Sequence, residues 1–249
     1  MSRKNYIACA VLLLVSESVL AKHLLKESTD LIFRPFGVFN VGADFIRSGR
    51  SQTVTLLPPF SNHYTNSDNY QSSGSLGGGL GIESFKSERL FWQLGVSAYF
   101  DSQVTNSGDV WQFGLPEFNN LTYSYQTQYS RIVASGKILS TVKQRIHPYL
   151  SGELGVGFNR VSGYHEIPLI PEVLPMSPFR SATQSSFTWG AGVGLDVDLN
   201  APVRLGIGYQ FADLGKASLG LSPAQLTNDT LHVSNSYTHQ VRIQLTALI

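Results

Sequence analysis

The stretch FTWGAGVGLDVDL, residues 187–199, decides the fold class, because its residue types alternate with a period of two. One set is apolar or small: Phe187, Trp189, Ala191, Val193, Leu195, Val197 and Leu199. The set between them is small or polar: Thr188, Gly190, Gly192, Gly194, Asp196 and Asp198. Side chains of a strand point alternately to its two faces, so this strand has one oily face and one face of glycines and carboxylates. A soluble sandwich turns its oily face inward, whereas this pattern suits a barrel wall with lipid outside and a polar lumen inside.

Eight segments of this kind follow one another, each long enough to cross a bilayer as a tilted strand. They are residues 34–47, 73–85, 90–101, 121–139, 148–160, 185–199, 203–212 and 237–249. Connections 86–89, 140–147 and 200–202 are short, whereas 48–72, 102–120, 161–184 and 213–236 are long. This alternation is typical of outer-membrane barrels, and a soluble lipocalin-type barrel gives no reason for it. We therefore predict an all-β fold: a transmembrane antiparallel up-and-down β-barrel of eight strands with four long external loops.

Two details refine this prediction. The phase of the fourth segment shifts near residues 129–132, which indicates a β-bulge or a section projecting above the membrane. Aromatic residues gather at the segment ends nearest the long loops, at the expected depth of the lipid headgroups. These are Phe45, Phe100, Phe158, Phe187, Trp189, Phe211 and Tyr237, with Trp92 at the opposite rim.

The N-terminus has the layout of an export signal. Arg3 and Lys4 precede an apolar run over residues 7–15, and Ala21 ends a small-residue cleavage site. A retained membrane helix needs about 20 apolar residues, but this run stops at residues 16–18. We expect residues 1–21 to be a signal peptide and residues 22–249 to form one barrel domain in the outer membrane of a Gram-negative bacterium.

Composition excludes several classes of protein. The single cysteine, Cys9, lies within the export signal, so residues 22–249 offer neither a disulfide nor a thiolate metal site. Cys9 also precedes most of the apolar run, which disfavours lipoprotein processing. The net charge of +1 provides no excess of basic residues of the kind that binds nucleic acid. The 23 glycines and 11% aromatic residues fit closely packed strands, and we expect no cofactor.

A resemblance to a known superfamily supports this prediction. The stretch NSYTHQVRIQL, residues 235–245, resembles the closing strand of small outer-membrane barrels of the opacity-protein and OmpX/OmpA kind. In that group an aromatic residue usually ends the chain, whereas this chain ends in Ile249. As architecture the resemblance extends over the whole of residues 22–249, and it implies a surface-exposed barrel embedded in outer-membrane lipid.

An eight-stranded barrel is only wide enough for its own side chains. The alternation along each strand places charged residues of both signs inside this lumen. They are Asp44, Glu83, Asp101, Glu153, Asp196, Asp198, Arg204 and Arg242, and Lys137 is a further candidate. Unpaired buried charges are costly, so these groups should pair and plug the barrel. A proton or ion path gated by exchange of the pairs is the alternative.

The external loops are the expected place of any specific activity. One loop is apolar and rich in proline, and its candidate contact residues are Pro168, Leu169, Ile170, Pro171, Val173, Leu174, Pro175, Met176 and Phe179. It forms either an apolar tip that contacts a partner, host surface or lipid, or a flap folded over the barrel mouth.

Three functions follow from these features. The first is a structural, adhesive or surface-interaction role carried by the loops, with a host or cell-surface ligand. The second is a narrow channel for small solutes, since a wide porin needs more strands. The third is a lipid-modifying enzyme. His232 and Ser234 have the spacing of the pair in lipid A deacylase barrels, but no acidic residue follows Ser234 to orient the histidine. We therefore expect no enzymatic activity.

Overall fold

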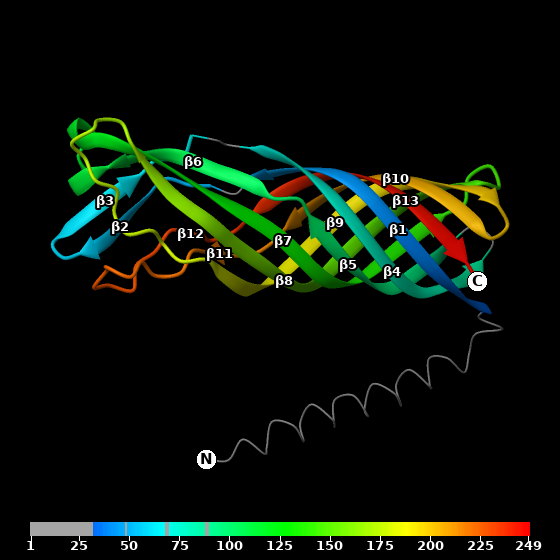
Figure 1. Ribbon diagram of the computed structural model, residues 1–249. Helices are drawn as coiled ribbons and strands as arrows, with labels where there is room; N and C mark the ends of the chain where they lie inside the picture. The colour runs from blue at the N-terminus through cyan, green and yellow to red at the C-terminus, as the bar shows by residue number, and fades with distance from the viewer. Residues whose placement is uncertain (1–31, 48, 68–69, 88–89) are drawn as a thin grey trace, which may run out of the picture.

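The computed structural model describes residues 32–47, 49–67, 70–87 and 90–249, which form one closed barrel with an extension at one end (Figure 1). The expected signal peptide, residues 1–21, lies outside the described residues. Eight long strands make the ring: β1 (Ile32–Arg47), β4 (Gln71–Ser87), β5 (Leu90–Asp101), β7 (Asn119–Ser140), β8 (Ile146–Pro168), β9 (Ala182–Asn200), β10 (Val203–Asp213) and β13 (Tyr237–Leu248).

The ring closes by antiparallel pairing between strands that follow one another along the chain. Each ring strand pairs with the next, from β1 with β4 round to β10 with β13. The last strand returns to the first, with Phe36 opposite Leu248 and Arg47 opposite Tyr237. The expected up-and-down barrel of eight strands is confirmed.

The two faces of the barrel wall differ in polarity. On β9, Phe187 points outward and is 64% exposed, whereas Asp196 points inward and is 1% exposed. The outer face carries exposed apolar side chains around the ring, including Phe39, Val41, Leu76, Leu80, Leu94, Val96, Ile132, Leu150, Leu154, Val193, Ile207 and Ile243. Such a band is stable against hydrocarbon, and closure leaves no strand edge unpaired in it. The chain is therefore an outer-membrane β-barrel protein. Among the described residues, no helix is long and apolar enough to cross a membrane.

The long external connections carry more regular structure than the sequence indicated. The first contains the hairpin β2 (Gln52–Leu57) and β3 (Phe60–Tyr64), and the last contains β11 (Ala217–Ser218) and β12 (His232–Val233). The second contains β6 (Val104–Trp111) and the 3-10 turns η2 (Gln112–Gly114) and η3 (Pro116–Phe118). Strand β8 continues to Pro168 rather than residue 160, which shortens the third connection to residues 169–181.

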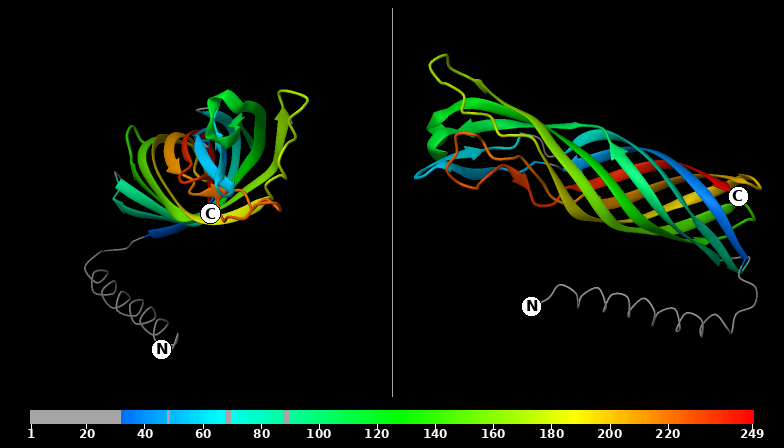
Figure 2. Two further views of the ribbon diagram at one scale, coloured as in Figure 1. Left: turned by 90° about the vertical axis from the view of Figure 1, so that its left-hand side faces the viewer. Right: turned by 60° about the horizontal axis from the view of Figure 1, so that its bottom comes forward.

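These connections and the outer ends of β7 and β8 form a compact unit, which we call the head (Figure 2). Its apolar core comprises Val54, Leu56, Tyr64, Val110, Leu121, Tyr123, Tyr125, Val161, Tyr164, Phe179, Ala217, Leu219 and Leu231. Residues contributed by all four connections pack here, so the head is a folded element and not a set of independent loops.

The position that the sequence predicts for a bulge in the fourth segment is wrong. On β7 the odd-numbered residues face inward without interruption from Leu121 to Arg131, so the phase does not shift at residues 129–132. The apparent shift arises because the inward set there, including Tyr129, Arg131 and Val133, mixes apolar and charged types. The register irregularity with β8 lies instead between Ser124 and Gln126. The outer part of β7 does project beyond the ring into the head.

Candidate functional site

The eight charged residues expected in the lumen all point into the barrel. Seven of them are no more than 7% exposed: Asp44, Glu83, Asp101, Glu153, Asp196, Arg204 and Arg242. The eighth, Asp198, lies at the periplasmic mouth with 31% of its side chain exposed. Lys137, the further candidate, also points inward.

At the periplasmic mouth the charges form one connected group. Arg204 Nη1 lies 2.7 Å from Glu83 Oε2, and its Nε lies 2.8 Å from Asp198 Oδ1. Glu83 also accepts a hydrogen bond from Gln93, and His147 Nε2 lies 2.8 Å from Asp198 Oδ2. Since β4 and β10 are separated by β1 and β13, the contact between Arg204 and Glu83 spans part of the lumen.

Farther in, Lys137 lies across the barrel. Its Nζ lies 3.2 Å from Asp196 Oδ2 and 2.6 Å from Gln244 Oε1. The same ammonium group lies 4.0 Å from the centroid of the Tyr149 ring. Strands β7 and β13 stand opposite each other in the ring, so the Lys137–Gln244 hydrogen bond crosses its full width.

The third group surrounds Glu153. Its Oε1 accepts hydrogen bonds from Arg242 Nη1 at 3.1 Å and from Tyr99 at 2.9 Å, and its Oε2 accepts one from Gln210 at 2.6 Å. A buried carboxylate with three donors is well compensated for lost hydration. The Arg242 guanidinium also lies 4.2 Å from the Tyr99 ring centroid, a cation–π contact.

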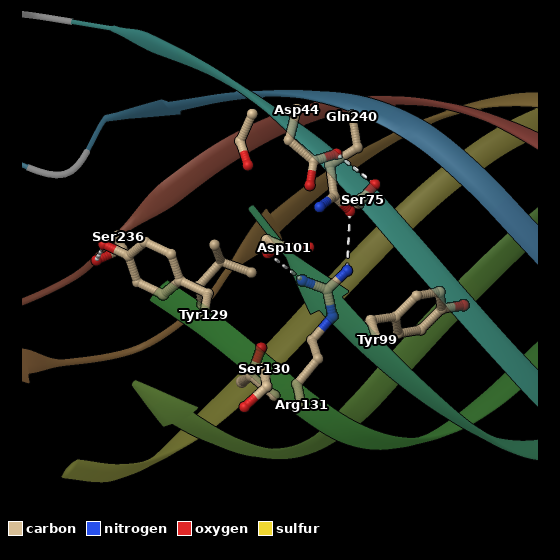
Figure 3. Close-up of polar contacts among 12 residues, drawn as sticks. Asp44, Ser75, Tyr99, Asp101, Tyr129, Ser130, Arg131, Ser236 and Gln240 are labelled. Atoms are coloured by element: carbon tan, nitrogen blue, oxygen red, sulfur yellow. Dashed lines mark hydrogen bonds and ion pairs between the residues drawn. The ribbon is translucent and has the colours of Figure 1, made fainter. Parts of the chain in front are cut away.

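Arg131 is a lumenal charge that the sequence analysis missed (Figure 3). Its Nη2 donates to Gln240 Oε1 at 3.0 Å, and its Nη1 lies 3.9 Å from Asp101 Oδ2. Its guanidinium lies 4.7 Å from the Tyr99 ring, so Arg131 and Arg242 both contact this ring. Continuous alternation along β7 would have identified Arg131, but the assumed phase shift concealed it.

Apolar side chains fill the lumen at two levels: beyond the charged groups on the outer side, and among them on the periplasmic side, where the Phe91 ring contacts His147 and Arg204. On the outer side, Ile46 lies one inward position beyond Asp44, and Tyr129 lies one beyond Arg131. These two belong to a buried cluster with Val104, Ala212 and Leu214. At the periplasmic side, Phe91, Leu139 and Tyr149 form another cluster. Between the clusters lies a cavity of about 40 Å3, lined in part by Ser97 and Lys137.

Inward glycines make room for the lumenal rings. A Cβ at Gly77 would lie 2.3 Å from the Tyr99 ring, and a Cβ at Gly208 would lie 2.1 Å from the Tyr149 hydroxyl oxygen. The glycine face read in the sequence therefore has a packing role: it lets large rings lie flat against the wall and fill the lumen.

The apolar loop divides into a buried part and an exposed part. Phe179 is 5% exposed and packs against the Tyr164 ring, with 4.9 Å between centroids. Val173 and Met176 are partly buried against the head core, whereas Leu169, Ile170 and Leu174 are exposed. Pro168 is the last residue of β8, and Pro171 and Pro175 lie exposed in the connection.

Glu166 fastens this loop to the head. Its Oε1 accepts a hydrogen bond from the Tyr164 hydroxyl, and its Oε2 accepts one from the Met176 backbone amide at 2.9 Å. Burial raises the pKa of Glu166 above its ordinary value. The loop from Leu169 to Met176 is thus tied down by a carboxyl group that lies outside the membrane.

The far end of the head is apolar and exposed. Phe60, at the start of β3, packs edge-on against Phe113, and Phe113 packs against Phe118. The amide of Leu169 bonds to the carbonyl of Asn120, which brings the third connection beside this group. We call the following exposed residues the apolar tip: Leu57, Phe60, Phe113, Leu115, Phe118, Leu169, Ile170 and Leu174.

The structure does not bring the expected histidine and serine together. His232 Nδ1 lies 3.0 Å from the Thr230 carbonyl oxygen, and Ser234 Oγ lies 3.5 Å from Arg50 Nη1. Another pair, Ser124 and His165, is adjacent across β7 and β8, with Oγ 3.1 Å from Nε2 and 3.4 Å from Nδ1. Near-equal distances to both ring nitrogens place the oxygen off the lone-pair axis of either, which is poor geometry for a general base.

Comparisons with known proteins bear on the fold. No protein-family model and no curated protein matches the sequence. Among solved structures, Neisserial surface protein A has a TM-score of 0.46 and 12% identity, covering 86% of this chain and 96% of that chain. Ail, the attachment invasion locus protein of Yersinia pestis, in complex with the heparin analogue sucrose octasulfate, has a TM-score of 0.36 and 10% identity, covering 86% and 99%. The outer membrane protease OmpT of Escherichia coli has a TM-score of 0.40 and 5% identity, covering 90% and 99%. These likenesses, at identities of 5–12% and TM-scores of 0.36–0.46, concern the fold alone.

Proposed function

We propose that the protein is a surface-interaction protein whose barrel is a closed anchor and whose head contacts a host or cell-surface partner. The observation that carries this proposal is the apolar tip, which stays exposed although a buried core lies directly beneath it. Exposed apolar patches on a folded surface are costly and commonly mark contact sites. In this proposal residues 1–21 direct export, and outer-membrane lipid surrounds the barrel.

The lumen favours an anchor over a channel. Hydrogen bonds cross its full width between β7 and β13, and buried apolar clusters fill the lumen at its outer end and near its periplasmic mouth. The cavity of about 40 Å3 is far smaller than the about 300 Å3 at the lower end of ligand pockets. Solute passage would require several of these contacts to break together.

An enzymatic role has weaker support. Neither the His232 and Ser234 pair nor the Ser124 and His165 pair has the geometry of an activated nucleophile. The proposal therefore assigns the head to binding.

Adhesion of bacteria that display the protein to an epithelial-cell monolayer tests the tip directly. We expect the variant F60S/F113S/L174S to lose most of the adhesion conferred by the wild-type chain. V142S is the matched control, because Val142 is equally apolar and exposed but lies at the periplasmic end. Equal adhesion of the triple variant and the wild type, at equal surface expression, would refute a contact role for the tip.

A second measurement tests the closed anchor. Refolded wild-type protein, with folding verified by its heat-dependent gel shift, should give no steady conductance steps in a planar bilayer. Reproducible steps from folded protein would make the channel the better assignment.

A further inference from the structure

An open cavity of about 530 Å3 lies at the outer end of the seam between β1 and β13. The polar residues that line it come from the end of β1, the start of the first connection and the approach to β13: Arg47, Arg50, Ser51, Ser234, Asn235 and Tyr237. Arg47 and Tyr237 are cross-strand partners, so their side chains share the outer face of the barrel.

This cavity has an excess of positive charge. Arg47 and Arg50 are both exposed, and no ion pair joins either of them to a carboxylate within the described ranges. The neighbouring carboxylate of Asp213 already accepts hydrogen bonds from the Gly215 amide and from Asn235, at 2.9 and 2.8 Å. Two guanidinium groups beside two serine hydroxyls therefore remain available to an anion.

The depth of the cavity identifies the source of that anion. Tyr237 stacks on Phe211, with 5.7 Å between centroids and 20° between ring planes, and Phe211 packs against Trp189. Such outward-facing rings mark the headgroup layer of a membrane. Arg47 lies directly opposite Tyr237 in the pairing of β1 with β13, and Arg50 follows three residues later in the first connection, so both arginines lie beside this layer of rings.

We propose that this cavity binds a phosphate group, carried by the headgroup of an outer-leaflet lipid. The planar guanidinium fork matches the geometry of phosphate oxygens and forms paired charge-assisted hydrogen bonds with them. The hydroxyl groups of Ser51, Ser234 and Tyr237 supply further donors around the same space. The site is independent of the apolar tip and does not rest on the proposed surface interaction.

Binding of lipid A to the full mature chain, refolded in zwitterionic detergent, tests this site. Wild-type protein should bind phosphorylated lipid A at least about tenfold more tightly than the dephosphorylated form, since charge-assisted hydrogen bonds are lost without the phosphates. The variant R47Q/R50Q should lose this preference. The control R160Q/R180Q removes two exposed arginines outside the cavity and should keep it.

Three outcomes decide the proposal. A preference that persists in folded R47Q/R50Q, or that falls equally in R160Q/R180Q, overturns it, because general surface charge would then account for binding. Competition by inorganic phosphate supports a site that reads phosphate from either source. A preference for phosphorylated lipid without such competition supports the site and assigns it to the lipid headgroup.

Discussion

Lys137 Nζ and Gln244 Oε1 lie 2.6 Å apart although their strands, β7 and β13, stand on opposite sides of the ring. A second hydrogen bond joins the same two strands, Arg131 with Gln240 at 3.0 Å, and a third joins Tyr129 to Ser236, the residue before β13, at 2.9 Å. The barrel is thus cross-braced at successive levels, so the separation of its walls is set by side chains as well as by the backbone ladder.

Removing two of these braces should open a path through the barrel. In K137A/R131A the carboxylates of Asp196 and Asp101 remain and lose their basic partners, so the enlarged lumen becomes negative. We expect cation-selective conductance steps in planar bilayers from folded variant protein, where the wild type is silent. Anion-selective steps, or continued silence, would show that these braces do not hold the lumen shut.

Breaking the ion pair of Arg242 should destabilise the barrel without preventing its insertion. The substitution R242M leaves Glu153 buried without its cationic partner, which should lower the free energy of unfolding by about 3–5 kcal/mol. Urea unfolding of protein refolded in vesicles measures this change. The double variant R242M/E153Q should recover part of the loss, and an unchanged midpoint in R242M would remove Arg242 from the network.

The close contact of Gly208 with Tyr149 predicts a specific rescue. A Cβ at residue 208 would lie 2.1 Å from the Tyr149 hydroxyl oxygen but 3.2 Å from the ring carbon Cζ that carries it. G208A should therefore cost about 1–3 kcal/mol of stability, as overpacking does. Adding Y149F removes the clashing oxygen and should restore most of the loss. Additive losses in the double variant, measured by the same unfolding assay, would contradict this packing model.

The Glu166 contact predicts that the third connection is held more firmly at low pH. Because the folded state raises the pKa of Glu166 above 4.5, its stabilising effect is complete below pH 4.5 and is lost as pH rises through the folded-state value. The hydrogen-exchange protection factor of the Met176 amide should fall across that range. In E166Q the amide oxygen can still accept from Met176, so protection should persist at high pH. A pH-independent protection factor in the wild type would contradict this linkage.

The sequence predicts the barrel well because a period of two is a local property. Alternation alone places Asp196 inside and Phe187 outside, whatever the neighbouring strands do. It cannot pair Glu83 with Arg204, because that contact depends on the register and tilt of strands that are not adjacent. Arg131 shows a different limit: where an inward face carries mixed residue types, the alternation is continuous but difficult to recognise.

The head was the less predictable part for a related reason. Proline and apolar residues in the third connection were compatible with either an exposed tip or a flap over the barrel mouth, and in the structure one part of this segment is buried in the head while another part is exposed. Burial of Phe179 depends on the Tyr164 and Tyr64 rings, which reach it from β8 and from the first connection. Such contacts join distant parts of the chain and have no periodic signature.

The pairing of β1 with β13 also constrains the order in which the molecule can form. Arg47 pairs with Tyr237, and Phe36 pairs with Leu248. One edge of β1 therefore stays unpaired until nearly the whole chain has been synthesised and has reached the membrane. Contacts this remote in sequence are slow to form. Assembly must therefore proceed from a curved, open sheet whose two edge strands, β1 and β13, are kept from pairing with other chains. The pairing of β1 with β13 is the last step and closes the barrel.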